Sequence, residues 1–272
     1  MKVYEGSQSF KKPDRAVATM GTFDGVHLGH QRLLQLLRTK AQEIGGETVL
    51  VTFWPHPRLV LTHTHAAPIQ LLTGLEEKIT LLAQQGIDHL VVLPFTPAFS
   101  QLSASDFIQQ VFVEQLGTQH IIIGHDHRFG KGRSGDVALL QESGYRHGFT
   151  VTEVTPIMVN DEIISSTKIR KLLLAGDVEQ AQAYLGRPYT MPCTVQKDNV
   201  GSRAELTVIP TGKHQLIPGE GSYEVQVTYQ NIVHSGKIHI TGNDLTLEAP
   251  TLSAPITEEA SLYIAFTKHR SQ

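Results

Sequence analysis

Cysteine is nearly absent from the sequence, since Cys193 is the single cysteine among 272 residues. A lone cysteine cannot form an internal disulfide, which is typical of proteins in a reducing compartment. The N-terminal stretch 1–15 contains no apolar segment of the signal-peptide type, and no apolar run in the chain is long enough to cross a bilayer. We therefore expect a cytoplasmic protein with no membrane partner, in which Cys193 is a structural thiol.

The sequence also lacks a large net charge. It has 23 Lys and Arg residues against 26 Asp and Glu residues, a formal net charge of −3, so no nucleic-acid partner is expected. Hydrophobic residues make up 40% and charged residues 18%, which is ordinary for a globular protein and excludes extended disorder. A small anionic ligand remains possible, because it needs only a local positive site.

Several common catalytic motifs are missing. The chain has no G-x-x-x-x-G-K-[ST], no G-x-S-x-G and no cysteine-pair metal motif. Gly130–Gly135 has the formal spacing G-x-G-x-x-G, but Asp126–Phe129 separates it from the preceding predicted strand. We interpret it as a flexible basic loop rather than a dinucleotide site. His63 and His65 suggest a metal only faintly, and a solvated loop is the preferred interpretation.

Strand-like and helix-like patterns alternate over the first two thirds of the chain. Apolar, β-branched runs predict strands at Ala16–Met20, Thr48–Phe53, Leu90–Leu93, Ile121–Ile123 and Thr150–Val154. Helical spacing and capping signals predict helices from Leu33 to Ile44, from a capping box at Thr73 and Glu76 to about Gln85, and over Ser103–Leu116, Val137–Gly148, Ser166–Ala175 and Val178–Leu185. This alternation predicts an α/β domain with a Rossmann-like parallel sheet covered on both faces.

After Gly186 the pattern changes to short strands separated by Gly, Pro and Asn turns. The predicted strands lie at Val195, Leu206–Ile209, Tyr223–Tyr229, Lys237–Ile240, Leu245–Leu247 and Leu262–Phe266. We therefore place a domain boundary near 186, with the α/β domain over residues 1–186 and a small all-β, barrel-like module over residues 187–272.

The strongest site signal is the segment Gly21–His30, where the first predicted strand ends and the first helix begins. The carboxyl ends of strands in an open α/β sheet form the ligand crevice, and a helix N-terminus there favours phosphate. His27 and His30 lie three residues apart, on one side of the helix start, where imidazole donors could stabilise transition-state charge. A glycine-rich turn with two surface histidines and a metal-binding pair without an evident third ligand are the alternatives.

A second phosphate-binding signal is Ser165-Ser166-Thr167, with Lys168 and Arg170 close behind. Hydroxyl groups, backbone N–H groups and positive charge at a helix start are typical of a phosphate cradle. An ordinary N-cap with solvated basic residues is the alternative.

These motifs resemble those of a known family. His27-Leu28-Gly29-His30 resembles the His-x-Gly-His signature of the nucleotidylyl transferase superfamily, and the whole of Gly21–His30 resembles bacterial FAD synthetase, the FMN adenylyltransferase module of bifunctional riboflavin kinase/FAD synthetase. Further segments that match the family in order are Thr52–Pro57, Gly124–Gly130 with His127 in place of an aromatic residue, Ile164–Arg170 and Leu185–Tyr189. The resemblance covers about residues 14–190.

The resemblance implies that the protein joins FMN and ATP to give FAD and pyrophosphate, with Mg²⁺ arriving on the ATP phosphates and no metal site of the protein's own. It implies catalytic roles for His27, His30 and Arg170. The implied ATP-binding residues are Gly21, Thr22, Phe23, Asp24, Gly25, His27, Gly29, His30, Ser165, Ser166, Thr167 and Arg170. The implied flavin-binding residues are Phe53, Pro55, His56, Pro57, Asp126, Arg128 and Phe129. A rigid turn at Phe53–Pro57 and a structural role for Asp126 are the alternatives.

The C-terminal module departs from the riboflavin kinase that follows in bifunctional relatives. The kinase signature Gly-x-Pro-Thr-Ala-Asn has no counterpart in Gly201–Pro210, and Pro218–Tyr223 only loosely resembles a later kinase motif. The remaining length is also short for a whole kinase module. Because phosphoryl transfer depends on residues that place metal and phosphate, we expect a barrel without kinase activity.

Three other functions remain open from the sequence. One is a bifunctional enzyme with a divergent kinase, and another is a nucleotidylyl transferase that acts on a different phosphorylated acceptor. The third is a non-enzymatic flavin sensor.

Overall fold

The computed structural model describes residues 1–6, 8–61, 68–155, 158–159, 162–198, 205–252 and 259–270. The chain forms two compact units, one made of Met1–Ile69 and Leu75–Ile163 and the other of Gln70–Gly74 and Ile164–Gln272. The predicted boundary near 186 lies inside the second unit, and the extent of the transferase domain stays a prediction. His63 and His65 lie outside the described residues, as do residues 201–204.

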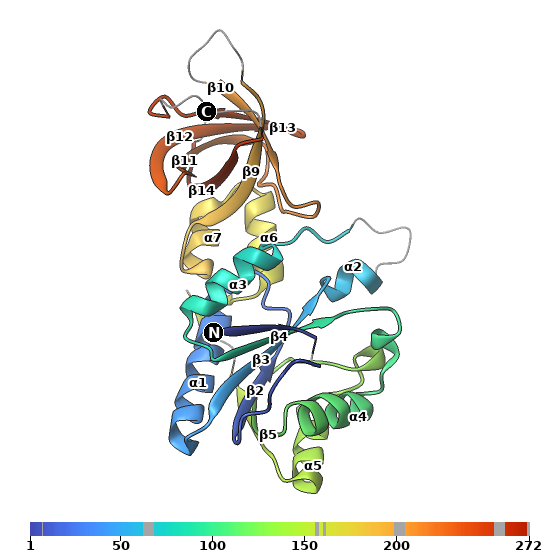
Figure 1. The fold of residues 1–272 in the computed structure, drawn as a ribbon. Coiled ribbons are helices and arrows are strands. Elements are labelled where there is room, and N and C mark those ends of the chain that lie inside the picture. The colour runs from blue at the N-terminus through green and yellow to red at the C-terminus, as the bar shows by residue number, and fades with distance from the viewer. Residues whose placement is uncertain are drawn as a thin grey trace. The chain divides into compact units, whose positions relative to one another are not determined.

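The first unit is built on a parallel sheet of six strands in the order β1-β4-β3-β2-β5-β6 (Figure 1). The strands are β1 (Lys2–Glu5), β2 (Ala16–Met20), β3 (Glu47–Trp54), β4 (His89–Pro94), β5 (Thr118–Gly124) and β6 (Thr150–Val154). The predicted parallel sheet is confirmed, and so is the position of each predicted strand. The edge strand β1 was not predicted, because four mostly exposed residues carry little apolar pattern.

Helices cover both faces of this sheet. They are α1 (Leu28–Ile44), α2 (Pro57–Leu61), α3 (Leu75–Gln84), α4 (Ala104–Phe107) and α5 (Val137–His147), with short 3-10 turns at Phe99–Gln101 and Lys131–Arg133. The helix predicted over Ser103–Leu116 begins at the N-cap Ser103, but its second part, Ile108–Gln115, is a π-helix. The short helix α2 was not predicted.

Side chains of each strand alternate between two apolar clusters. Ala16 and Ala18 pack with α4, the π-helix and α5, whereas Val17 packs with α1 and α3 on the opposite face. Figure 1 shows α1 on one side of the sheet and α4 and α5 on the other. β2 lies between β3 and β5, near the centre of the sheet. Its carboxyl end and the loop that follows therefore lie near the middle of the row formed by the carboxyl ends of the strands.

The second unit contains two helices, a closed antiparallel barrel and the short segment Gln70–Gly74. Its elements are α6 (Ser166–Leu174), α7 (Val178–Leu185), β9 (Tyr189–Asp198), β10 (Glu205–Pro210), β11 (Gly221–Tyr229), β12 (Ile232–Thr241), β13 (Asp244–Glu248) and β14 (Ser261–Arg270). The predicted barrel-like module is confirmed as a closed barrel, which leaves no free sheet edge. A small hairpin, β7 (Met158–Val159) and β8 (Glu162–Ile163), belongs to the first unit.

The barrel interior is filled by side chains. Tyr223, Phe266 and Cys193 are fully buried, and burial raises the pKa of the Cys193 thiol to about 12. Such a thiol is protonated at neutral pH, in accord with the structural role expected for it. Among the described residues, no helix combines the length and the apolar character needed to cross a bilayer.

Candidate functional site

The Gly21–His30 segment connects β2 to α1 at the carboxyl edge of the sheet. His27 is the N-cap residue of α1, and its Nδ1 accepts a hydrogen bond from the backbone N–H of His30 at 3.3 Å. The two imidazole rings stack with their centroids 3.6 Å apart and an interplanar angle of 17°. The structure therefore brings the two predicted histidines into direct contact at the start of a 17-residue helix.

The backbone of this segment is strained. Phe23 and Val26 are both buried and have φ angles of 46° and 40°, in the left-handed region that non-glycine residues rarely adopt. A hydrogen bond from the Val26 N–H to the Phe23 carbonyl, 3.2 Å long, closes the turn between them. Strain of this kind persists only where the surroundings hold the backbone, and it clusters at functional sites.

Gly29 is required by the close approach of the His27 ring. A Cβ atom on residue 29 would lie 3.1 Å from both Cε1 and Nδ1 of His27, closer than most side-chain contacts allow. The glycine of the His-x-Gly-His motif therefore permits the stacking of His27 on His30.

The His30 imidazole is partly buried, at the start of α1. Burial lowers its pKa well below the usual value, and the charges of His27 and Lys78 lower it further. Its Nδ1 atom is buried and has no hydrogen-bond partner among the described residues. His30 is therefore neutral at pH 7, and a neutral imidazole retains one N–H donor.

Lys78 is a residue of this site that the sequence reasoning missed. It lies on α3, is 1% exposed, and places its Nζ 5.5 Å from the centroid of the Trp54 ring. Burial lowers its pKa to about 8, against the opposing effect of the Asp24 carboxylate. The available signal was its spacing, because Lys78 is one turn from both Leu75 and Leu82 on the apolar side of the predicted helix.

The hydroxyl-rich segment begins α6 in the second unit. The Ser165 Oγ accepts a hydrogen bond from the Lys168 N–H at 3.3 Å, so Ser165 is the N-cap that the alternative interpretation predicts. Lys168 lies over the Tyr184 ring, with its Nζ 5.4 Å from the centroid. The Arg170 Nε donates to the Gln70 carbonyl at 2.7 Å. Ser166 and Thr167 occupy the first turn, where backbone N–H groups point out of the helix.

The predicted flavin-binding residues divide into separate groups. Phe53 and Phe129 each contact Phe107, with ring centroids 6.4 Å and 5.7 Å apart, and so belong to one aromatic cluster. His56 is buried, and its Nδ1 accepts from the Arg58 N–H at 3.1 Å at the start of α2. Pro55 and Pro57 flank His56 in the same loop.

A cavity of about 650 Å³ lies beside the aromatic cluster. It is lined by β1, the ends of β3 and β4, α3 and the π-helix, with Trp54, Phe99 and Leu102 among its apolar residues. Phe99 also contacts Phe53, with ring centroids 6.0 Å apart. The volume suits a ligand of drug or cofactor size, and the lining is mainly apolar.

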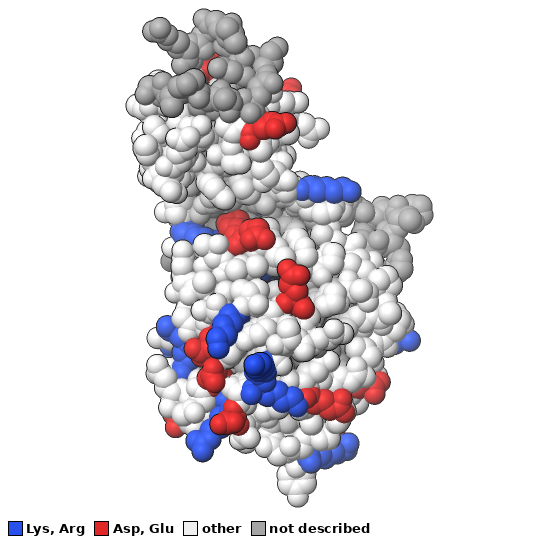
Figure 2. Space-filling view, in the orientation of Figure 1, with Lys and Arg blue, Asp and Glu red and all other residues white. Residues whose placement is uncertain are grey.

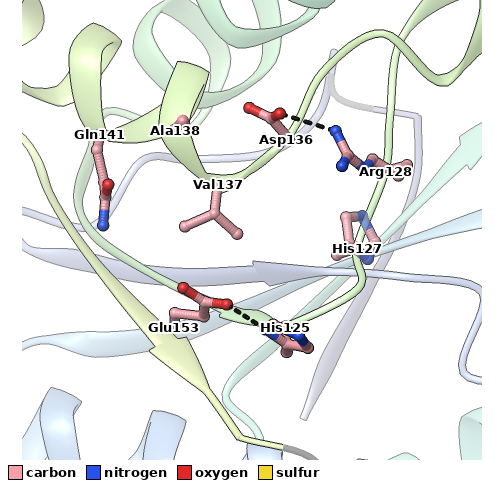
Figure 3. Close-up of a pocket in the computed structure, with 8 residues that line it drawn as sticks. All are labelled: His125, His127, Arg128, Asp136, Val137, Ala138, Gln141 and Glu153. Atoms are coloured by element: carbon pink, nitrogen blue, oxygen red, sulfur yellow. Dashed lines mark hydrogen bonds and ion pairs between the residues drawn. The ribbon is translucent and has the colours of Figure 1, made fainter.

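Arg128 lies apart from that cavity. It forms an ion pair with Asp136 at 2.7 Å across a smaller cavity of about 280 Å³, where His125 also contacts Glu153 at 2.6 Å (Figure 3). His127 lines the same cavity, and burial lowers its pKa to about 4. Arg128 and Phe129 are neighbours in one sequence motif, but the Arg128 side chain lines the smaller cavity and the Phe129 side chain packs in the aromatic cluster.

The two ends of the Gly130–Gly135 loop pack against α4, whereas residues 131–134 between them are exposed. Lys131–Arg133 form a 3-10 turn, and a Cβ on Gly130 would lie 2.6 Å from the Ala104 Cα. Glycine is needed at Gly130 for this contact with α4, and the flexibility of the loop stays a prediction.

On the face drawn in Figure 2, the described Lys and Arg residues lie among Asp and Glu residues, without a broad patch of one sign. Within the described ranges, no group of three or more His, Cys, Asp or Glu side chains is arranged to hold a metal ion. An anionic substrate would therefore be recognised through local groups such as those at the start of α1.

Comparison with known proteins identifies the family. Residues 9–168 match the model of the FAD synthetase family. A bifunctional riboflavin kinase/FMN adenylyltransferase from Buchnera aphidicola subsp. Schizaphis graminum is 35% identical over 232 residues, covering 84% of this chain and 74% of the relative. The protein of the same description from Escherichia coli K12 is 34% identical over 232 residues, 84% of this chain and 73% of the relative.

A solved structure shares the fold of the chain. It is described as a macrolide-efflux protein from Streptococcus pneumoniae, and it matches with a TM-score of 0.85 and 22% identity over 98% of this chain and 89% of its own. At that identity the likeness supports the fold alone. The family match and the extended similarity to the curated relatives carry the assignment: the chain belongs to the FAD synthetase family and contains an FMN adenylyltransferase domain that uses ATP and FMN.

Proposed function

We propose that His27 and His30 stabilise the charge that develops on the ATP phosphates during adenylyl transfer. In this reaction an FMN phosphate oxygen attacks the α-phosphorus, the bond from that phosphorus to the bridging oxygen breaks, and pyrophosphate leaves. The stacked imidazoles at the start of α1 support the proposal most directly, because preorganised N–H donors at a helix N-terminus favour phosphate charge. No covalent enzyme intermediate is required.

Ser166, Thr167 and Arg170 would hold the leaving pyrophosphate. Ser166 and Thr167 lie in the first turn of the nine-residue helix α6, and Arg170 follows one turn later. The other ATP-binding residues of the proposal are Gly21, Thr22, Phe23, Asp24, Gly25, Gly29 and Ser165. Mg²⁺ would enter as part of the Mg·ATP substrate and neutralise phosphate charge.

The flavin ring would bind beside the aromatic cluster. Phe53 and Phe129 belong to that cluster, and Phe99 connects it to the apolar cavity of about 650 Å³. Pro55, His56 and Pro57 would border the ring from the loop after β3, and Asp126 and Arg128 would act from the loop after β5.

Riboflavin kinase activity is absent in this proposal. The segment Gly201–Pro210 lacks the Pro-Thr-Ala-Asn signature, and the side chains of Tyr223 and Phe266 fill the barrel interior. The barrel would then have a structural role. We also propose a cytoplasmic location, on the observation that Cys193 is a free, buried thiol.

Pyrophosphate release, measured with ATP and several acceptors, tests these proposals. FMN should support release, whereas riboflavin should yield neither pyrophosphate nor FMN, and other phosphorylated acceptors should be inactive. FMN formation from riboflavin and ATP would contradict the loss of kinase activity. Binding of FMN without pyrophosphate release would favour a flavin sensor instead.

A further inference from the structure

α3 carries a lysine on its inward side. Lys78 is 1% exposed and lies one helical turn from Leu75 and Leu82, which pack in the apolar cluster shared with α1. An ammonium group removed from water is destabilising unless it is paired, and lysine is rarely buried completely. Packing of α3 would be served equally well by an apolar residue, so the lysine calls for another explanation.

Side chains from two other segments act on the Lys78 ammonium. Trp54, at the end of β3, places its ring within cation–π distance. Asp24, which is 1% exposed, acts on Lys78 from the Gly21–His30 segment, and the charge of Lys78 acts in turn on His30. Lys78 thus links the end of β3 to the segment that carries both imidazoles.

We propose that Lys78 is a positioning residue of the transferase site, whose buried ammonium, placed over the Trp54 ring and attracted by the Asp24 carboxylate, fixes the Gly21–His30 segment so that both imidazoles meet the ATP phosphates. This inference rests on the proposed roles of His27 and His30 and adds to them. With 1% of its surface exposed, Lys78 acts from behind the segment rather than on the substrate.

The backbone of the Gly21–His30 segment is strained and needs stabilising contacts. Phe23 and Val26 have the strained φ angles of 46° and 40°, one on each side of Asp24. Strained residues keep their conformation only when neighbouring interactions over-determine it. Phe23 and Val26 pack in the same apolar cluster as Trp54 and Leu82 of α3, and the Lys78 charge acts on the buried Asp24 between them.

Electrostatics supports the same role. Burial, then the charge of His27, then the charge of Lys78 lower the pKa of His30. The pKa of Lys78 is itself about 8, lowered by burial and raised by Asp24, so Lys78 is mostly protonated at pH 7. Its positive charge therefore favours the neutral form of His30 at the pH where the enzyme would work.

Replacement of Lys78 by Met or Gln in the full chain tests the inference. Misplacement of reacting groups by about 1 Å can cost 10² in rate, so kcat for pyrophosphate release should fall by about 10² in K78M. Tm should fall, because K78M removes the positive charge that acts on the buried Asp24 carboxylate, and removal of one of two buried opposite charges is destabilising. The His30 pKa, followed by NMR titration, should rise because one of the charges that lower it is gone.

Asp24→Asn and the double variant D24N/K78M extend the test. D24N should lower kcat, and adding K78M should lower it little more, because the two residues act as one unit. Lys40→Met is the matched control, since the Lys40 Nζ forms an ion pair with Glu43 on α1, 3.1 Å away, and its side chain is 34% exposed. K40M should retain wild-type kcat and leave the His30 pKa unchanged.

The outcomes separate this inference from the proposed function. Wild-type kcat in K78M and K78Q, beside an H30A variant that has lost turnover, would overturn the role of Lys78 and leave the histidines in place. Full turnover in H30A would overturn the proposed role of the histidines and this inference with it. Fully additive losses of kcat in the double variant would show that Lys78 and Asp24 do not act as one unit and would also overturn it. So would wild-type kcat in K78M and K78Q at a temperature where both are fully folded, which would show that Lys78 acts only in stability.

Discussion

The imidazole of His27 caps α1 and lies flat against the imidazole of His30, with the two ring centroids 3.6 Å apart. Two positive charges at that separation would repel strongly, so the stacked arrangement favours neutral rings. The pair therefore offers N–H donors to a polyanionic substrate without requiring either ring to be protonated. This pairing is the basis of the first two predictions.

His30→Ala should reduce kcat for FAD formation by about 10²–10³, the range found when one preorganised donor to a developing charge is removed. His147→Ala is the control, because His147 is exposed at the end of α5. Steady-state kinetics with FMN and ATP would measure both variants. Equal turnover in H30A and the wild type would contradict the role of His30.

Gly29→Ala should lower kcat by less than about 10², because the His27 ring would have to move by only part of the ~1 Å that can cost 10² in rate. The reason is steric, because the new Cβ would lie 3.1 Å from the His27 ring and would push it away from its stacked position. Gly74→Ala is the matched control, since a Cβ at Gly74 would meet no atom within 4 Å. A G29A enzyme as fast as G74A would show that the stacking is not needed for turnover.

Acid should destabilise the first unit through His127. Burial lowers its pKa from 6.5 to about 4, so the unfolded chain binds more protons than the folded protein between these values. The contribution of His127 is fully present above pH 6.5 and is lost as the pH falls towards 4. A shift of this size corresponds to roughly 3 kcal/mol in the free energy of unfolding.

His127→Phe removes that proton-binding group and should flatten the loss of stability between pH 6.5 and 4. Urea unfolding at several pH values would measure the effect, with His147→Gln as the exposed control. If H127F lost stability with falling pH as steeply as H147Q, the interpretation of a buried neutral imidazole would fail.

Cys193 should be unreactive in the folded protein. Its thiol is fully buried in the barrel, and its pKa of about 12 keeps the thiolate fraction small at pH 8. A chromogenic disulfide reagent should label no cysteine under native conditions and one cysteine after denaturation in guanidinium chloride. Rapid native labelling would mean that the barrel opens readily.

Several features of this protein follow from local sequence alone. The buried run Ala16–Met20 has no polar alternation, so it predicts a central strand covered on both faces. Ser103 and Gly45 mark a helix start and a helix end by capping chemistry that acts within a few residues. The Gly21–His30 motif indicated the helix start at His27, because its glycines and histidines are neighbours along the chain, and its phosphate chemistry stays a prediction.

Other features depended on tertiary contacts. The edge strand β1 exists because β4 offers free hydrogen-bonding groups to residues 2–5, which the apolar pattern does not reveal. Arg128 and Phe129 are adjacent in the sequence after β5, yet Arg128 donates to Asp136 at the start of α5 while Phe129 packs in the aromatic cluster.

Lys78 shows most clearly the difference between what local sequence predicts and what tertiary contacts decide. By sequence it is an ordinary helical lysine, which usually extends its charged end into water. Its burial follows from the docking of α3 beside the Gly21–His30 segment and Trp54, residues separated from it by tens of positions in the chain. The sequence by itself determined the strands, the helix ends and the family motifs, because these depend on chemistry between residues close in the chain. Packing decided how buried each side chain is and which charges surround it. The physical reason is that desolvation of a group depends on every segment that packs around it.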